Sequence, residues 1–126
     1  MTDSLRAGMA TLDFEFFRSQ VMDMSDLADA LVESMHREWA ELAPSLEPES
    51  IGGDLDIVRE NAHRLKGALG TVGARKAAQI AGDLEHAAAA GDVLSARTHA
   101  AALLAVSEET GIALDDALKE LAGSAA

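Results

Sequence analysis

The composition of this 126-residue chain limits the chemistry that it can carry out. The chain has the size of one domain, and with one Trp, three Phe and no Tyr its hydrophobic core must be mainly aliphatic. The absence of cysteine excludes disulfides, thiolate metal sites and a cysteine nucleophile, and the formal net charge of −12 argues against nonspecific binding to nucleic acid or to an anionic membrane surface.

The sequence also lacks the patterns of export and membrane insertion. Its first residues do not combine a positively charged segment with an apolar run, and nowhere do 18 apolar residues follow one another. We therefore expect a cytoplasmic protein that does not bind membranes. Residues that favour helix are abundant, so we expect a single all-helical domain over residues 1–126, with a core of about 12–121 and frayed termini.

Two helices are predicted in the first third of the chain. A short leading helix is expected before residue 25, with Leu12, Phe16 and Phe17 as its apolar residues. Ser25 is the predicted N-cap of a second helix, which ends before Pro44. The apolar residues of this second helix are Leu27, Leu31, Met35, Trp39 and Leu42. Residues 43–54 contain both prolines and a glycine pair and are expected to form a loop.

Residues 55–72 show a regular helical pattern. Asp54 is expected to cap the start of this helix and Gly73 to end it. Apolar residues recur at spacings of three and four, a pattern typical of a helix packed in an antiparallel bundle. They are Leu55, Val58, Ala62, Leu65, Leu69 and Val72.

Two further helices are predicted after Gly73. The first covers residues 74–90 and stops at Gly91, and the last begins near Val93 to Ser95, with Gly111 as a candidate kink or interruption. The apolar residues of the last helix include Leu94, Ala101, Leu104, Leu114, Leu118 and Leu121. The short connection at Gly73 makes its two helices antiparallel neighbours. The chain therefore predicts an up-down antiparallel four-helix bundle with an additional short N-terminal helix.

His63 is predicted to face solvent, because it lies about 130° from the mean direction of the apolar residues of its helix. Lys66, Gly67 and Gly70 share this outer face. Each glycine destabilises a helix interior by about 1 kcal/mol relative to alanine. We interpret both as room for another macromolecule to approach the imidazole; close packing against a neighbouring helix is the alternative.

The sequence Ala62-His63-Arg64-Leu65-Lys66-Gly67, followed by Gly73-Ala74, resembles the A-H-x-L-K-G signature of histidine phosphotransfer (HPt) domains. The segment "DLEHAAAAGD" at residues 83–92 is similar to the end of the next helix in that family, and the resemblance extends from about Leu12 to Leu121.

The resemblance implies roles for three residues. His63 is expected to accept and donate a phosphoryl group, Lys66 to help hold it, and Gly67 to leave room for the active site of the partner. The sequence departs from the family at Ala68 and Leu69, where a serine or another polar residue often follows the Lys-Gly pair.

The same resemblance implies a monomeric phosphocarrier of a multistep phosphorelay, not an enzyme with kinase or hydrolase activity. Its expected partners are a hybrid histidine kinase and the receiver domains of response regulators, with Mg²⁺ on the receiver and no cofactor on this chain. Five basic residues against one acid between Ile57 and Gly82 suit an acidic partner. The candidate partner contacts are Arg59, Arg64, Gly70, Arg75 and Lys76.

Two other classes of function compete with this one. Glu33–His36 and Glu60–His63 have the Glu-x-x-His spacing of di-metal bundles, but both pairs are predicted to point away from the core, so we expect no metal site. Met35 and Trp39 are interpreted as core residues. A helical interaction module that works without phosphorylation remains an alternative.

Overall fold

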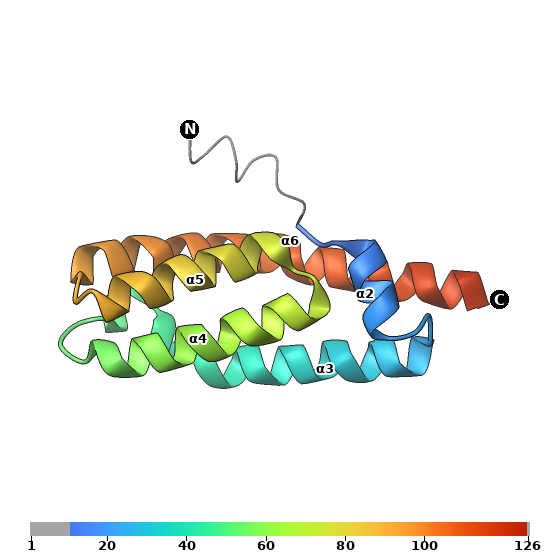
Figure 1. Ribbon diagram of the computed structural model, residues 1–126, viewed down its shortest axis with the longest axis horizontal. Helices are drawn as coiled ribbons and strands as arrows, with labels where there is room; N and C mark the ends of the chain where they lie inside the picture. The colour runs from blue at the N-terminus through green and yellow to red at the C-terminus, as the bar shows by residue number, and fades with distance from the viewer. Residues whose placement is uncertain (1–10, 126) are drawn as a thin grey trace.

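The computed structural model describes residues 11–125, and their side chains up to Gly123. Four long helices run alternately in opposite directions along the long axis of the molecule, and the short helix α2 (Phe14–Gln20) crosses one end of them (Figure 1). The four are α3 (Ser25–Leu42), α4 (Leu55–Val72), α5 (Arg75–Ala89) and α6 (Val93–Ala125). The predicted all-α up-down bundle with an additional N-terminal helix is thus confirmed. The fraying expected at residues 1–10 lies outside the described residues.

The core lies where the four long helices meet, and Phe17 and Val21 of the α2 segment close one end of it. The apolar face predicted for α4 is confirmed, because Val58, Ala62 and Leu65 are at most 3% exposed. Helix α5 contributes many small side chains to the core, which lets α4 and α6 pack closely against it. Its buried residues are Ala77, Ile80, Ala81, Leu84, Ala87 and Ala88.

The predicted apolar residues of the other helices need correction at three positions. Leu27 and Leu94 are 39% and 76% exposed and Ala101 is also exposed, so none of the three belongs to the core. The buried face of α6 includes several alanines, so it cannot be identified from the positions of the leucines alone. The residues that α6 buries are Ala96, Ala100, Leu103, Val106, Thr110, Leu114, Ala117 and Leu121.

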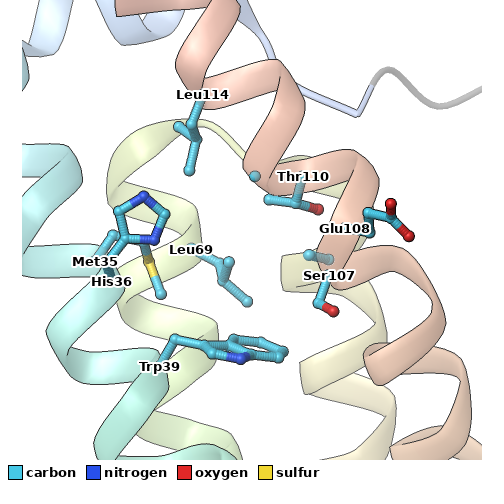
Figure 2. Close-up of a pocket in the computed structure, with 10 residues that line it drawn as sticks. Met35, His36, Trp39, Leu69, Ser107, Glu108, Thr110 and Leu114 are labelled. Atoms are coloured by element: carbon cyan, nitrogen blue, oxygen red, sulfur yellow. The ribbon is translucent and has the colours of Figure 1, made fainter.

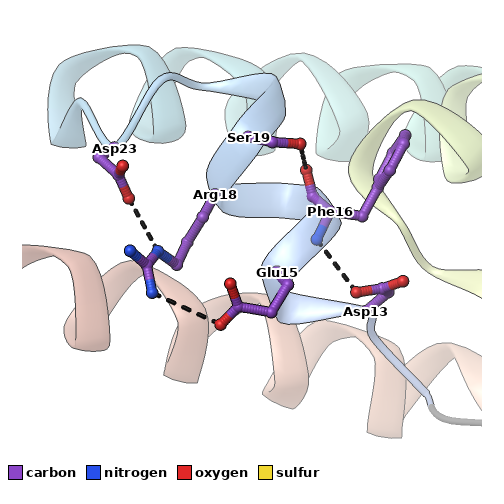
Figure 3. Close-up of polar contacts among 6 residues, drawn as sticks. All are labelled: Asp13, Glu15, Phe16, Arg18, Ser19 and Asp23. Atoms are coloured by element: carbon purple, nitrogen blue, oxygen red, sulfur yellow. Dashed lines mark hydrogen bonds and ion pairs between the residues drawn. The ribbon is translucent and has the colours of Figure 1, made fainter.

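The prediction that Ser25 caps the second helix is wrong. Met24 has the extended backbone of an N-cap, and Ser25 is already helical. Just before it, Met22 and Asp23 have φ angles of 53° and 57°, which turn the chain sharply between α2 and α3. The Arg18 side chain donates a 2.8 Å hydrogen bond to the Asp23 carboxylate and supports this turn (Figure 3). The tight turn therefore shifts the start of α3 by one residue, and the serine hydroxyl leaves the capping position.

Residues 43–54 are more regular than the predicted loop. They contain two short 3₁₀ helices, η1 (Ala43–Leu46) and η2 (Pro48–Ser50). Leu46 and Ile51 are buried, and Arg97 of α6 donates a 2.8 Å hydrogen bond to the Ile51 carbonyl. Apolar burial and this bond hold the connection against the bundle.

Helix α6 continues through Gly111, so the interruption considered there is absent. The hydrogen-bonded ladder of a long helix tolerates one glycine at a modest loss of stability.

The turn between α4 and α5 determines how these helices face each other. Gly73 adopts a left-handed φ of 80°, as predicted for a glycine that ends a helix. The Ala74 N–H donates to the Leu69 carbonyl at 2.9 Å, and the Gly73 carbonyl accepts a 2.8 Å hydrogen bond from the Asp13 N–H. A Cβ at residue 73 would lie 3.0 Å from the Asp13 carbonyl oxygen. The turn therefore needs glycine both for its backbone conformation and for its contact with the segment before α2.

Candidate functional site

His63 lies on the outer face of α4, with its side chain 68% exposed. The helix buries the opposite face, to which Ala62 and Leu65 belong. The outward orientation predicted from the helical pattern is thus confirmed. An exposed imidazole on a rigid, well-packed helix is accessible to another macromolecule while its backbone stays in place.

Glu85 of α5 links His63 to Lys66. Its carboxylate lies 2.9 Å from Nδ1 of His63 and 3.6 Å from Nζ of Lys66, and its side chain is only 24% exposed. An ionised carboxylate accepts hydrogen bonds but cannot donate them, so Nδ1 must carry the proton of this bond. In the neutral ring that leaves the lone pair on Nε2. The contact therefore fixes both the tautomer and the orientation of the imidazole.

The side chain of Lys66 also runs along α5. Its Cδ lies 3.6 Å from the position that a Cβ on Gly82 would occupy, so the glycine leaves a shallow path for the lysine stem. Lys66 itself is 52% exposed. Its ammonium group is thereby held near His63 and is still open to solvent.

Gly67 and Gly70 border open space. A Cβ placed on either glycine would have no atom within 4 Å among the described residues outside the local helix backbone. The alternative that these glycines serve close helix packing is therefore excluded. Beside Gly67 a groove of about 420 Å³ runs between α3 and α4, with Leu31, Met35 and Ala68 among its lining residues. The surface next to the imidazole is thus both unobstructed and partly apolar.

The departure from the family pattern at Ala68 and Leu69 has a simple structural context. Leu69 is buried and belongs to the core, and Ala68 is partly buried beside the groove. The imidazole instead donates a hydrogen bond to the carboxylate of Glu85 on the neighbouring helix.

The other candidate partner contacts differ in how they are held. Arg64 forms ion pairs with Glu38 at 2.9 Å and Glu41 at 3.5 Å, which tie α4 to α3. Lys76 pairs with Glu109 of α6 at 2.9 Å. Within the described part of the chain, Arg59 has no hydrogen bond or ion pair through its side chain, and it is exposed one turn before His63. Arg59 is thus the most available of these three cations.

Arg75 fastens the segment before α2 to the start of α5. Its guanidinium lies 2.9 Å from the Asp13 carboxylate and 5.4 Å from the centre of the Phe16 ring. Asp13 also accepts a 3.0 Å hydrogen bond from the Phe16 N–H and so caps α2 (Figure 3). That backbone hydrogen bond and the one from Arg75 hold the pKa of Asp13 below its ordinary value of 3.8. Arg75 therefore has a structural role in addition to any contact with a partner.

Glu85 is the site residue that the sequence did not identify. His63 lies ten residues before Gly73, and Glu85 lies eleven residues after Ala74. Two antiparallel helices joined by so short a turn bring such positions side by side. The spacing of these residues therefore contained the information that Glu85 lies beside His63, but using it required the geometry of the turn.

Two further observations concern metal sites and membrane spans. No group of three or more His, Asp or Glu side chains among the described residues is arranged to hold a metal ion. The Glu33–His36 pair is exposed on α3, as its predicted orientation requires. None of the helices in residues 11–125 is both long enough and apolar enough to cross a membrane.

The comparisons with known proteins agree with the geometry. A family model described as the Hpt domain matches residues 16–124, which is nearly the whole chain. No curated protein and no solved structure matches it.

Proposed function

The chain belongs to the Hpt domain family, whose members carry phosphoryl groups on a histidine in phosphorelay signalling, and we propose that His63 is the carrier residue of this protein. The expected exchange is with aspartates of response-regulator receiver domains, after phosphorylation that begins at a hybrid histidine kinase. The protein is a carrier of the phosphoryl group and a substrate of its partners.

The proposed step is attack of the Nε2 lone pair of His63 on the phosphorus of an aspartyl phosphate. The new bond joins Nε2 to phosphorus, the bond between phosphorus and the aspartate oxygen breaks, and the aspartate leaves as a carboxylate. No proton has to be removed, because Nδ1 already carries the ring proton. The phosphorylated ring is then cationic, and the Glu85 carboxylate at 2.9 Å stabilises that charge.

The same arrangement favours transfer in the reverse direction. A ring that keeps its Nδ1 proton leaves phosphorus as neutral imidazole, which is a better leaving group than an imidazolate anion. Lys66, one turn beyond His63, supplies a cation for the phosphoryl oxygens. Phosphoryl transfer depends mainly on positioning and charge stabilisation, so these two side chains and a receiver that binds Mg²⁺ form a sufficient site.

The observation that carries the proposal is the contact between Glu85 and Nδ1 of an exposed histidine, beside a glycine face with open space. This contact leaves Nε2 as the free ring nitrogen. The open face at Gly67 leaves space for the acidic active site of a receiver to reach it.

A transfer assay tests the proposal. The protein is mixed with a phosphorylated receiver domain and Mg²⁺, and acid-labile, base-stable phosphate is followed on wild-type, His63→Gln and His86→Gln proteins. His86 is an exposed histidine on α5 and serves as the matched control. Transfer to the wild type and to His86→Gln, but not to a folded His63→Gln, is the expected result.

Phosphate on His63→Gln would place the carrier at another residue. No transfer from a panel of receivers to the folded wild type would favour the alternative, an interaction module that works without phosphorylation.

A further inference from the structure

A cavity of about 160 Å³ opens between α3 and α6 (Figure 2), and none of the residues proposed for phosphoryl transfer lines it. Leu69 of α4 and Ala77 of α5 also form part of its wall, so the cavity extends to the other two long helices of the bundle. In Figure 2 the His36 and Trp39 rings lie on the α3 side, and Thr110 and Leu114 lie opposite on α6. We call this cavity the α3–α6 slot.

The slot is open because several of its lining residues are small, and larger side chains at these positions would fill it. Ala77, Ser107 and Gly111 all line it. Gly111 occupies the interior of a 33-residue helix, where glycine is disfavoured. A Cβ on it would have no atom within 4 Å among the described residues outside the local helix backbone, so close packing does not explain the glycine. Gly111 thus keeps space open beside the slot.

The walls of the slot suit an aromatic ring. Met35, Leu69 and Leu114 are buried and apolar, and Trp39 adds an aromatic surface. A methionine sulfur and an indole both make favourable contacts with aromatic rings. An apolar cavity of about 150 Å³ is large enough to bind benzene, so the slot has room for a single ring.

The polar groups of the slot restrict the ligand further. Ser107 and Thr110 donate their hydroxyl hydrogens to carbonyls of their own helix and leave only acceptor lone pairs. Neither the His36 ring nor the Trp39 indole N–H bonds to another residue within the described part of the chain. Glu108 is exposed at the rim, and the whole chain carries a net charge of −12, which disfavours an anion.

We propose that the α3–α6 slot binds one small, uncharged, single-ring aromatic molecule that carries a polar group such as a hydroxyl. The ring lies between the apolar side chains, and the polar group points to the mouth, where His36 and Trp39 offer hydrogen bonds. This site is independent of His63 and of the phosphoryl-transfer proposal.

Titration of the full ¹⁵N-labelled chain with benzyl alcohol tests the site, with benzoate as the anionic control ligand. Benzyl alcohol is expected to give saturable shifts at the amides around the slot, with a dissociation constant of about 1 mM or lower. Benzoate is expected to bind about tenfold more weakly or worse, because its charge faces Glu108.

Gly111→Leu is the test variant, because its side chain fills the open space of the slot; it is expected to lose benzyl alcohol binding. Gly123→Leu adds the same side chain to the same helix at an exposed position outside the slot, and it is expected to bind as the wild type does. Intermolecular nuclear Overhauser contacts from the benzyl ring to Met35 and Leu114 test the site in the wild type alone, should Gly111→Leu not fold.

Three results would overturn the proposal: no saturable shift at about 10 mM benzyl alcohol, well above the expected constant, equal affinity in a folded Gly111→Leu, or contacts from the ring to residues outside the slot. Benzoate that binds as tightly as benzyl alcohol would overturn the assignment of an uncharged ligand.

Discussion

A histidine acts as a nucleophile through a ring nitrogen that is both unprotonated and exposed. In this protein the state of Nε2 depends on Glu85, a residue 22 positions away on another helix, through its contact with Nδ1. His63 and Lys66 share that single carboxylate. In the proposed site, the imidazole therefore acts together with the Lys66 and Glu85 side chains.

Glu85→Ala is predicted to slow phosphoryl transfer to His63 by about tenfold, because a hydrogen bond to a charged group contributes about 1.5 kcal/mol. Single-turnover transfer from a phosphorylated receiver measures the rate. Glu60→Ala is the matched control, since Glu60 is exposed on α4 and has no hydrogen-bond or ion-pair partner in the described residues. Equal rates for Glu85→Ala and Glu60→Ala would contradict the role of Glu85.

Gly67 is predicted to lower the stability of α4 and to give a partner access to the His63 imidazole. Gly67→Ala should raise the free energy of unfolding by up to about 1 kcal/mol, because alanine is the better helix former and a Cβ meets no neighbour there. Gly67→Leu should slow transfer by crowding the surface beside the imidazole. Urea denaturation and the transfer assay measure the two effects. A Gly67→Leu protein that transfers at the wild-type rate would contradict the role of this glycine in access.

At the scale of elements, the α4–α5 turn connects the site to the N-terminal helix. Gly73 ends α4, and its carbonyl accepts the Asp13 N–H. Asp13 in turn caps α2 and pairs with Arg75, the first residue of α5. The same turn that brings Glu85 opposite His63 thus also holds α2 against the bundle.

The Asp13 contacts predict a dependence of stability on pH. The folded-state pKa of Asp13 lies below its ordinary value of 3.8, so the stabilisation is fully present above that value. It is lost as the pH falls through the lowered folded pKa and the carboxylate becomes protonated. Wild type should therefore be more stable than Asp13→Asn near neutral pH, and the difference should shrink below about pH 4.

Thermal unfolding of both proteins between neutral and acidic pH measures this difference. Asp29→Asn is the control, because Asp29 is exposed on α3 and unpaired within the described side chains. A gap between wild type and Asp13→Asn that stays constant down to acidic pH would show that the charge of Asp13 is unimportant.

At the scale of the whole molecule, positive charge is concentrated around the site of a strongly acidic protein. Between Ile57 and Gly82 the local charge is +4, so the remainder of the chain carries −16 to complete the total of −12. Ion pairs within the chain hold Arg64, Arg75 and Lys76. Among the basic residues between Ile57 and Gly82, Arg59 is unpaired within the described side chains and is the most available to a partner.

Arg59→Ala is predicted to lower the rate of association with a receiver by about two- to tenfold at low salt, and to weaken the salt dependence of that rate. Stopped-flow binding at several ionic strengths measures both quantities. Lys119→Ala removes an exposed cation from α6 and is the matched control for net charge. The same loss of rate in both variants would mean that only total charge matters.

The features that depend on local interactions could be predicted from the sequence. The order of the helices, the start of α4 at Leu55, its end at Gly73 and the outward orientation of His63 all follow from periodicity and capping, which act over a few residues. Local signals were misleading at Ser25, where the tight turn before α3 decided the helix start, and at Leu94, whose apolar side chain is exposed.

The contacts between groups that are distant in the chain could not be predicted in this way, because they depend on how the helices pack. The register of α4 against α5 placed Glu85 beside His63, and the packing of α3 and α6 left a slot at Gly111. The same packing paired Arg64, Arg75 and Lys76 with carboxylates of other segments. These contacts join residues that are far apart in the chain, and a pattern that repeats every three or four residues carries no information about which helix will lie opposite.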